Sequence, residues 1–200
     1  MKILLDVGAH TGQTVSIAHK YPFDAIFCFE PVISCAERVE KAHYDRTTVC
    51  PYGLWNKEGD FPVYAAETLS GSVFFKRIGH EEVCRFVKAS DWVRDHIAEN
   101  DFVVMKLNCE GAECDIIDDL VCGAMLKRLA VVMIDFDVRK IRSQRHREQE
   151  IRTLLKEHGE PPHVIFASDI LEFSGHGWKD FTRYWLDLID FNTEKCMKIC

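Results

Sequence analysis

Short apolar runs rich in β-branched and aromatic residues alternate along the chain with segments of helical periodicity. The strand-like runs are residues 3–7, 25–30, 47–52, 102–108, 130–137 and 163–167, followed by another near 183–189. The helix-like segments are residues 12–20, 33–44, 112–126 and 142–158. This repetition of strand and helix predicts an α/β fold with a doubly wound, mostly parallel sheet that is covered on both faces.

Residues 59–89 break this rhythm. They form turn-like and strand-like patterns such as "GDFPVYAAE" and "SGSVFF", without a convincing helix. We therefore expect an antiparallel β insertion at the rim of the sheet, after its third strand. A helix resumes in "ASDWVRDHI", where Ser90 or Asp91 can act as the N-cap. Because 200 residues suffice for one well-buried core, residues 1–200 are predicted to form a single domain.

The composition narrows the classes of partner. A formal net charge of −7 disfavours nucleic acid and anionic membrane as partners, because both bind clustered Lys and Arg. The nine cysteines are scattered through apparent strands and helices, which favours free thiols over disulfides. No group, including Cys196 and Cys200, has the ligand spacing of a metal site. The apolar run before Asp6 is too short for a signal peptide and no later run could span a bilayer, which predicts a cytoplasmic protein.

The stretch "LLDVGAHTG", residues 4–12, combines the first strand, a turn and the start of the first helix. Ligands of parallel sheets bind beyond the carboxyl ends of the strands, and Gly8 allows the backbone a sharp turn there while Gly12 allows close packing of the helix. The G-x-G-x-x-G pattern of dinucleotide-binding proteins is absent. The Asp6 carboxylate would repel a pyrophosphate but attract an ammonium or sulfonium group.

A second carboxylate, Glu30, ends the second strand-like run, 24 residues after Asp6. An acidic side chain at this place can accept hydrogen bonds from both hydroxyls of a ribose. Either residue alone also has a structural interpretation, as part of a common turn or as a solvated strand end. Together they favour a nucleoside with a positively charged tail, which is S-adenosylmethionine.

Six segments, in order, resemble the motifs of the FkbM family of S-adenosylmethionine-dependent methyltransferases. They are "DVGAHTG", "FCFEP", "YGLWNKEGDFPVY", "SGSVF", "ASDW" and "VVMKLNCEGAECDII", and the resemblance extends from residue 3 to about residue 137. It implies a Rossmann-like, seven-stranded methyltransferase sheet, the cofactor, and in many members methylation of a hydroxyl on a sugar or other small metabolite. From the residue patterns and this resemblance together, the candidate cofactor-binding positions are Asp6, Gly8, Ala9, His10, Gly12, Glu30, Pro31 and Asn108.

The fourth strand-like run ends in alternating polar residues, Lys106, Asn108 and Glu110, which predicts that they share one side of the strand end. The family motif usually has aspartate where this chain has Asn108, and an amide cannot act as a general base. We expect Glu110 to be the first candidate base and Asp135 and Asp137 the next, with Lys106 also in the catalytic site and Asn108 orienting a ligand. For Lys106 and Glu110 the alternative is a structural ion pair with the following helix.

Two further features of the sequence concern the substrate that would accept the methyl group. The basic cluster in residues 139–147 either binds an anionic acceptor or lies on a solvated helix face. The loop of residues 174–181, with His176 and Trp178, is either an acceptor-side lid or hydrophobic cover. Three functions remain: a small-molecule O-methyltransferase, which the sequence favours; a methyltransferase for nitrogen, carbon or protein; and a non-catalytic nucleoside-binding protein.

Overall fold

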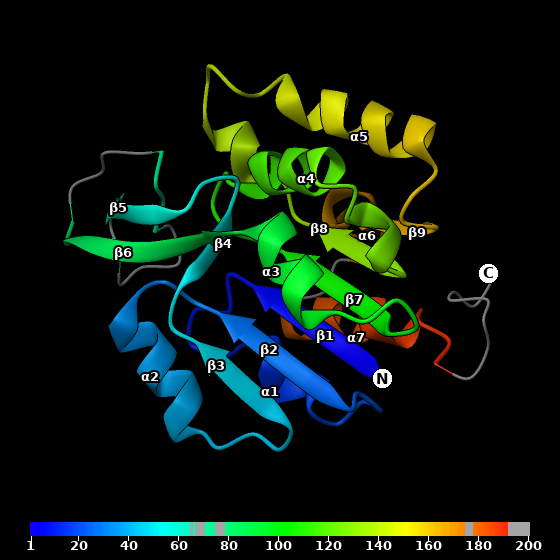
Figure 1. Cartoon of the computed structure of the whole chain (residues 1–200), viewed down its shortest axis with the longest axis horizontal. Coiled ribbons are helices and arrows are strands. Elements are labelled where there is room, and N and C mark those ends of the chain that lie inside the picture. Colours follow the sequence, from blue (N-terminus) through cyan, green and yellow to red (C-terminus); the bar gives the residue numbers. More distant parts are fainter. Residues whose placement is uncertain (65, 67–70, 75–78, 175–177, 192–200) are drawn as a thin grey trace.

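The chain forms an α/β structure around a six-stranded parallel sheet (Figure 1). This computed structural model describes residues 1–64, 66, 71–74, 79–174 and 178–191. The sheet has the order β3-β2-β1-β7-β8-β9, formed by Lys2–Val7 (β1), Ala25–Phe29 (β2), Thr47–Cys50 (β3), Phe102–Leu107 (β7), Val131–Ile134 (β8) and His163–Phe166 (β9). Strand order reverses between β1 and β7, so the carboxyl ends of these two strands flank the expected ligand crevice.

Helices cover both faces of this sheet (Figure 1). They are Val15–Ala18 (α1), Ile33–Lys41 (α2), Ala89–His96 (α3), Glu113–Cys122 (α4), Arg147–His158 (α5), Ala167–Ser174 (α6) and Trp178–Asp187 (α7), with 3-10 turns at Leu126–Arg128 (η1) and Asp137–Lys140 (η2). Alternate residues of β1 enter two separate apolar clusters, because successive side chains of a strand point to opposite faces. Ile3 and Leu5 pack with α3 and α4, whereas Leu4 packs with α1 and α7.

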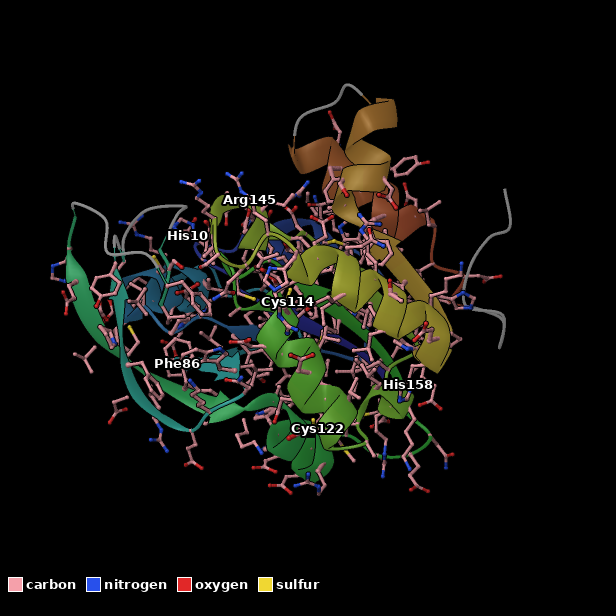
Figure 2. All side chains as sticks on the ribbon, turned by 90° about the horizontal axis from the view of Figure 1, so that it is seen from above. His10, Phe86, Cys114, Cys122, Arg145 and His158 are labelled. Carbon is pink, nitrogen blue, oxygen red and sulfur yellow. The ribbon has the colours of Figure 1, made fainter. Side chains whose placement is uncertain are left out.

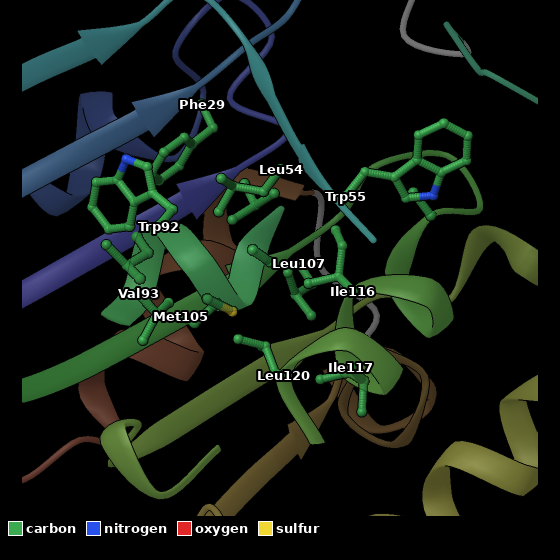
Figure 3. Close-up of a cluster of buried hydrophobic side chains, with 14 of the residues drawn as sticks. Phe29, Leu54, Trp55, Trp92, Val93, Met105, Leu107, Ile116, Ile117 and Leu120 are labelled. Carbon is green, nitrogen blue, oxygen red and sulfur yellow. The ribbon is translucent and has the colours of Figure 1, made fainter. Parts of the chain in front are cut away.

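The larger cluster holds the sheet to α3 and α4. Its aromatic members include Trp92 of α3, whose ring meets that of Phe29 edge-on at 4.8 Å between centroids. Leu107 of β7 and Ile116 of α4 are fully buried in the same cluster (Figure 3). These contacts fix the carboxyl ends of β2 and β7, the two strand ends that carry the predicted site.

A second, three-stranded sheet extends from one end of the main sheet (Figure 1). Gly59–Tyr64 (β5) pairs antiparallel with Glu81–Lys88 (β6). The short strand Gly53–Trp55 (β4) lies between the predicted third strand and residue 59 and was not predicted; it pairs parallel with β6 and makes the sheet mixed. Residues 65, 67–70 and 75–78 of the predicted insertion lie outside the described residues.

One predicted strand is wrong. The run near 183–189 belongs largely to α7, where the buried pairs Phe181/Trp185 and Thr182/Leu186 are each four positions apart, which is a helical spacing. The described residues therefore supply six strands to the main sheet and no seventh.

The N-cap of α3 is Lys88, and neither Ser90 nor Asp91 caps this helix. Within the described ranges, every helix is too short or too polar to cross a bilayer.

Candidate functional site

The turn after β1 is bound to the end of β2. The amide groups of Gly8 and Ala9 both donate to the carbonyl oxygen of Phe29, at 3.1 Å each. The next amide, that of His10, donates to Glu30 Oε2 at 2.8 Å, and the amide of Gly12 donates to the carbonyl of Ala9. The turn therefore directs these amide hydrogens to its own protein, unlike the glycine-rich turns that offer them to phosphate.

The same turn lies against the end of β7. Gly8 has φ = +79°, and a Cβ atom there would be 1.9 Å from the carbonyl oxygen of Asn108. Only glycine fits this backbone contact, since any side chain would have to displace a neighbouring strand end. Gly8 is thus required for the close approach of β1 and β7.

Glu30 follows β2 and is 6% exposed. Its carboxylate accepts hydrogen bonds from the amides of His10 and Val32, at 2.8 and 2.9 Å. Burial raises the pKa of Glu30 to about 7, while these two hydrogen bonds act in the opposite direction. Each carboxylate oxygen retains a lone pair, so the side chain can still accept a hydroxyl hydrogen.

Asp6 and Lys106 form a buried ion pair between β1 and β7. The two residues are in-register neighbours, so their side chains share a face of the sheet, and Lys106 Nζ lies 3.0 Å from Asp6 Oδ1. Lys106 also donates to the carbonyls of Gly8 and Val7, at 2.8 and 3.3 Å. Asp6 is 0% exposed, and its carboxylate neutralises the buried charge of Lys106 beneath the turn. The expectation that it contacts a ligand directly does not match this position.

Asn108 and Asp135 join the ends of β7 and β8. The Asn108 side-chain amide donates to Asp135 Oδ2 at 2.9 Å. The other carboxylate oxygen of Asp135 accepts from Arg139 at 3.3 Å. Burial, and next the charge of Asp137, raises the pKa of Asp135.

Glu110 forms a second charged cluster with Lys140 and Asp137, apart from the Asn108–Asp135 pair. Lys140 Nζ lies 3.0 and 3.1 Å from its two carboxylate oxygens and 2.7 Å from Asp137 Oδ1. Asp137 and Lys140 are three residues apart in η2, and side chains at this spacing in a 3-10 helix lie above one another. Burial, followed by the charge of Asp137, raises the pKa of Glu110 to about 7. Strand β7 ends at Leu107 and Glu110 has φ = +52°, so the predicted alternation does not continue to this residue.

Glu113 organises the loop that carries Glu110. Its Oε1 accepts from the amides of Cys109 and Gly111, at 2.8 and 3.1 Å, while Oε2 has no hydrogen-bond partner in the described part of the chain. The side chain is 0% exposed, and burial raises the pKa of Glu113 to about 7. Glu113 therefore supports this loop from beneath.

Glu113→Gln should stabilise the protein at pH 8. Because the folded state binds the Glu113 proton more tightly than the unfolded chain, its contribution is fully present below about pH 4.5 and is lost as the pH rises through about 7. Glutamine keeps the acceptor oxygen without the charge. We expect a gain of up to about 3 kcal/mol in urea unfolding at pH 8 that disappears near pH 4.5. Exposed Glu157→Gln is the control for losing one charge, and a less stable Glu113→Gln at pH 8 would contradict the assignment.

These groups surround a cavity of about 620 Å³ at the carboxyl edge of the sheet, a size typical of small-molecule sites. Its charged lining residues are Glu30, Glu110, Asp135, Asp137, Lys106 and Lys140. The second sheet and its connecting segment add an apolar wall formed by Leu54, Val63, Ala66, Val73 and Phe86. In Figure 2, His10 and Phe86 both lie in the half of the molecule that holds this sheet, away from His158.

No family model, curated protein or solved structure matches the chain. The site is therefore interpreted from its own geometry.

Most predicted site residues line the one cavity. The lining residues include Gly8, Ala9, His10, Glu30, Pro31, Lys106, Asn108, Glu110 and Asp135, but not Asp6 or Gly12. The apolar wall was not predicted, and Lys140 was considered only as part of the basic cluster 139–147. Its spacing three residues after Asp137 was a usable signal for their contact. His176 lies outside the described residues, and Trp178 begins α7.

The basic cluster of residues 139–147 is largely paired with carboxylates. Arg139 contacts Asp135 and Glu148, and Arg147 contacts Asp118 and Glu150. These pairs weaken the case for an anionic acceptor at the cluster. Across the described residues, no group of three or more His, Cys, Asp or Glu side chains could hold a metal ion.

Proposed function

We propose that this protein is an S-adenosylmethionine-dependent methyltransferase that acts on a hydroxyl of a small molecule. The observation that carries the proposal is the chemistry of the first turn, which uses its amides internally and leaves a carboxylate-rich cavity. Four carboxylates and two ammonium groups line this cavity, and Lys106 is already paired with Asp6. Such a lining favours a ligand with sulfonium and ammonium groups.

The residues present fit this cofactor. Glu30 stands at the end of β2, where it would accept the ribose hydroxyls, and the Gly8–His10 turn would adjoin the methionyl part. When bound, the cofactor supplies an activated methyl group whose carbon–sulfur bond breaks with both electrons passing to sulfur. The protein then needs mainly to orient an acceptor and remove its proton.

Strand order alone also fits a dinucleotide-binding protein, because β3-β2-β1-β7-β8-β9 is the order of that fold. The first turn argues against a dinucleotide. A pyrophosphate would meet no offered amide from Gly8, Ala9 or His10, and it would face the carboxylates of the cavity.

Glu30→Gln should weaken S-adenosylmethionine binding by roughly 5- to 150-fold, which corresponds to about 1 to 3 kcal/mol for a hydrogen bond to a charged group. Isothermal titration of the variant against the wild type measures this effect. The melting temperature must be recorded as well, because glutamine would turn a donor toward the amide of His10 or Val32. Unchanged affinity in a folded variant would remove Glu30 from the site.

Catalysis needs a separate measurement. Cofactor carrying an isotope in its methyl group, incubated with the protein and pooled small hydroxylated metabolites, should transfer the label to an acceptor. Binding without any transfer, across hydroxyl, amine and protein pools, would instead favour a non-catalytic nucleoside-binding protein.

A further inference from the structure

We infer that Asp135 is the proton acceptor of this site and that Asn108 is its positioning residue, so that the catalytic carboxylate lies at the end of β8 and not β7. This inference rests on the proposed methyl transfer. It assigns Glu110, the first candidate from the sequence, to a structural ion pair.

The carboxylates of Glu110, Asp135 and Asp137 differ in their contacts with cations. Lys140 contacts both oxygens of Glu110 and also Asp137, at distances from 2.7 to 3.1 Å. Among the described residues, the one cation in direct contact with Asp135 is Arg139, at 3.3 Å. That guanidinium is 46% exposed and also contacts Glu148 at 3.5 Å. Although burial raises the pKa of Glu110, Lys140 contacts both of its oxygens, so an acceptor hydroxyl would have to displace this close ammonium. The longer contact of Asp135 with the half-exposed Arg139 leaves Asp135 the most accessible proton acceptor of the three.

The Asn108 amide gives Asp135 a fixed orientation. Its Nδ2 donates to Asp135 Oδ2 at 2.9 Å, and both residues line the cavity. An aspartate at position 108, as in the usual family motif, would place two carboxylates against each other, and one of them would then have to hold a proton. Asparagine avoids this repulsion and leaves the ionised form to Asp135.

The proton balance is simple. As the acceptor oxygen bonds to the transferred carbon, its hydroxyl proton passes to the Asp135 carboxylate, which becomes neutral and later releases it to water. The charges facing Asp135 are Asp137, Arg139 and Lys140 from η2 and Lys106 from β7. All but Asp137 favour the ionised form that the reaction requires.

The test compares four variants: Asp135→Asn, Glu110→Gln, Asn108→Ala, and the exchange Asn108→Asp/Asp135→Asn. Asp135→Asn should lower kcat by about 10²- to 10⁴-fold, the range for a lost general base, with cofactor affinity changed by less than threefold. Glu110→Gln should cost less in kcat and more in melting temperature, because it weakens the contact with Lys140. The exchange retains one carboxylate and one amide, so it should keep the fold and cofactor affinity but not the turnover.

A further experiment measures the pKa of Asp135 directly in the protein without cofactor. Carbon-13 NMR of labelled aspartate carboxyls in the ligand-free protein should show a higher pKa for Asp135 in Asn108→Ala, since the variant loses a hydrogen bond to the ionised form. The acidic limb of the kcat/KM profile, which reports the pKa of the free enzyme, should move to higher pH by the same amount.

Turnover within tenfold of wild type in Asp135→Asn, or turnover restored by the exchange, would overturn the inference. So would an Asp135 titration unaffected by Asn108→Ala. A wild-type protein that binds no S-adenosylmethionine would instead refute the proposed function, so the two failures are distinguishable.

Discussion

Gly8→Ala is expected to destabilise the protein by about 3 to 5 kcal/mol, combining an unfavourable positive φ with overpacking against backbone. The added Cβ would lie 1.9 Å from the Asn108 carbonyl oxygen, so the ends of β1 and β7 must separate. The cavity lies directly above this contact, and ligand affinity should fall with stability. Urea unfolding and calorimetric titration measure the two losses.

Gly159→Ala is the matched control. Gly159 also has a positive φ, +69°, but a Cβ there would meet nothing within 4 Å. We expect a loss of only about 1 kcal/mol from the left-handed conformation itself. Equal losses in the two variants would show that the β1–β7 contact is less close than described.

Lys106→Met should cost about 3 to 5 kcal/mol, because it leaves the Asp6 carboxylate buried without its counter-ion. The double variant Asp6→Leu/Lys106→Met should recover most of this loss, since an apolar pair can replace a buried ion pair at little cost. Thermal and urea unfolding of the two variants measure the coupling between these side chains.

Lys41→Met is the control for this pair. Its partner Glu37 lies one helical turn away, and both side chains are more than half exposed, so we expect a loss below about 0.5 kcal/mol. Should Lys106→Met prove as mild, or should the double variant be worse than Lys106→Met alone, Asp6 and Lys106 would not act as a buried pair.

Local patterns predicted much of the fold. Each of the six strands of the main sheet corresponds to an apolar run in the sequence, because a strand buried on both faces must be apolar along its length. The run at 183–189 was mistaken for a strand because its aromatic and aliphatic residues are also typical of strands, although Phe181 and Trp185 have the four-residue spacing of a helix. Only the packing of α7 against Leu4 and its neighbours decides between them.

The sequence predicted those parts of the site that depend on a single strand end. The acidic end of β2 at Glu30 and the turn at Gly8 could be predicted from the residues beside them, but the contact of Gly8 with Asn108 could not. The position of Asp6 likewise depends on Lys106, which lies 100 residues later and is adjacent only through strand pairing. The pairing of Asn108 with Asp135 likewise joins two strand ends that are far apart in sequence. Contacts of this kind are set by sheet topology, which the periodicity of a single segment does not specify.

The most direct test is a calorimetric titration of the wild-type chain with S-adenosylmethionine, S-adenosylhomocysteine and NAD in parallel. The described site predicts saturable one-to-one binding of both adenosyl ligands, and NAD binding at least tenfold weaker, because the Gly8–His10 amides are bonded to Phe29 and Glu30. Tighter binding of NAD than of either adenosyl ligand, or no binding of the adenosyl ligands at all, would contradict the account.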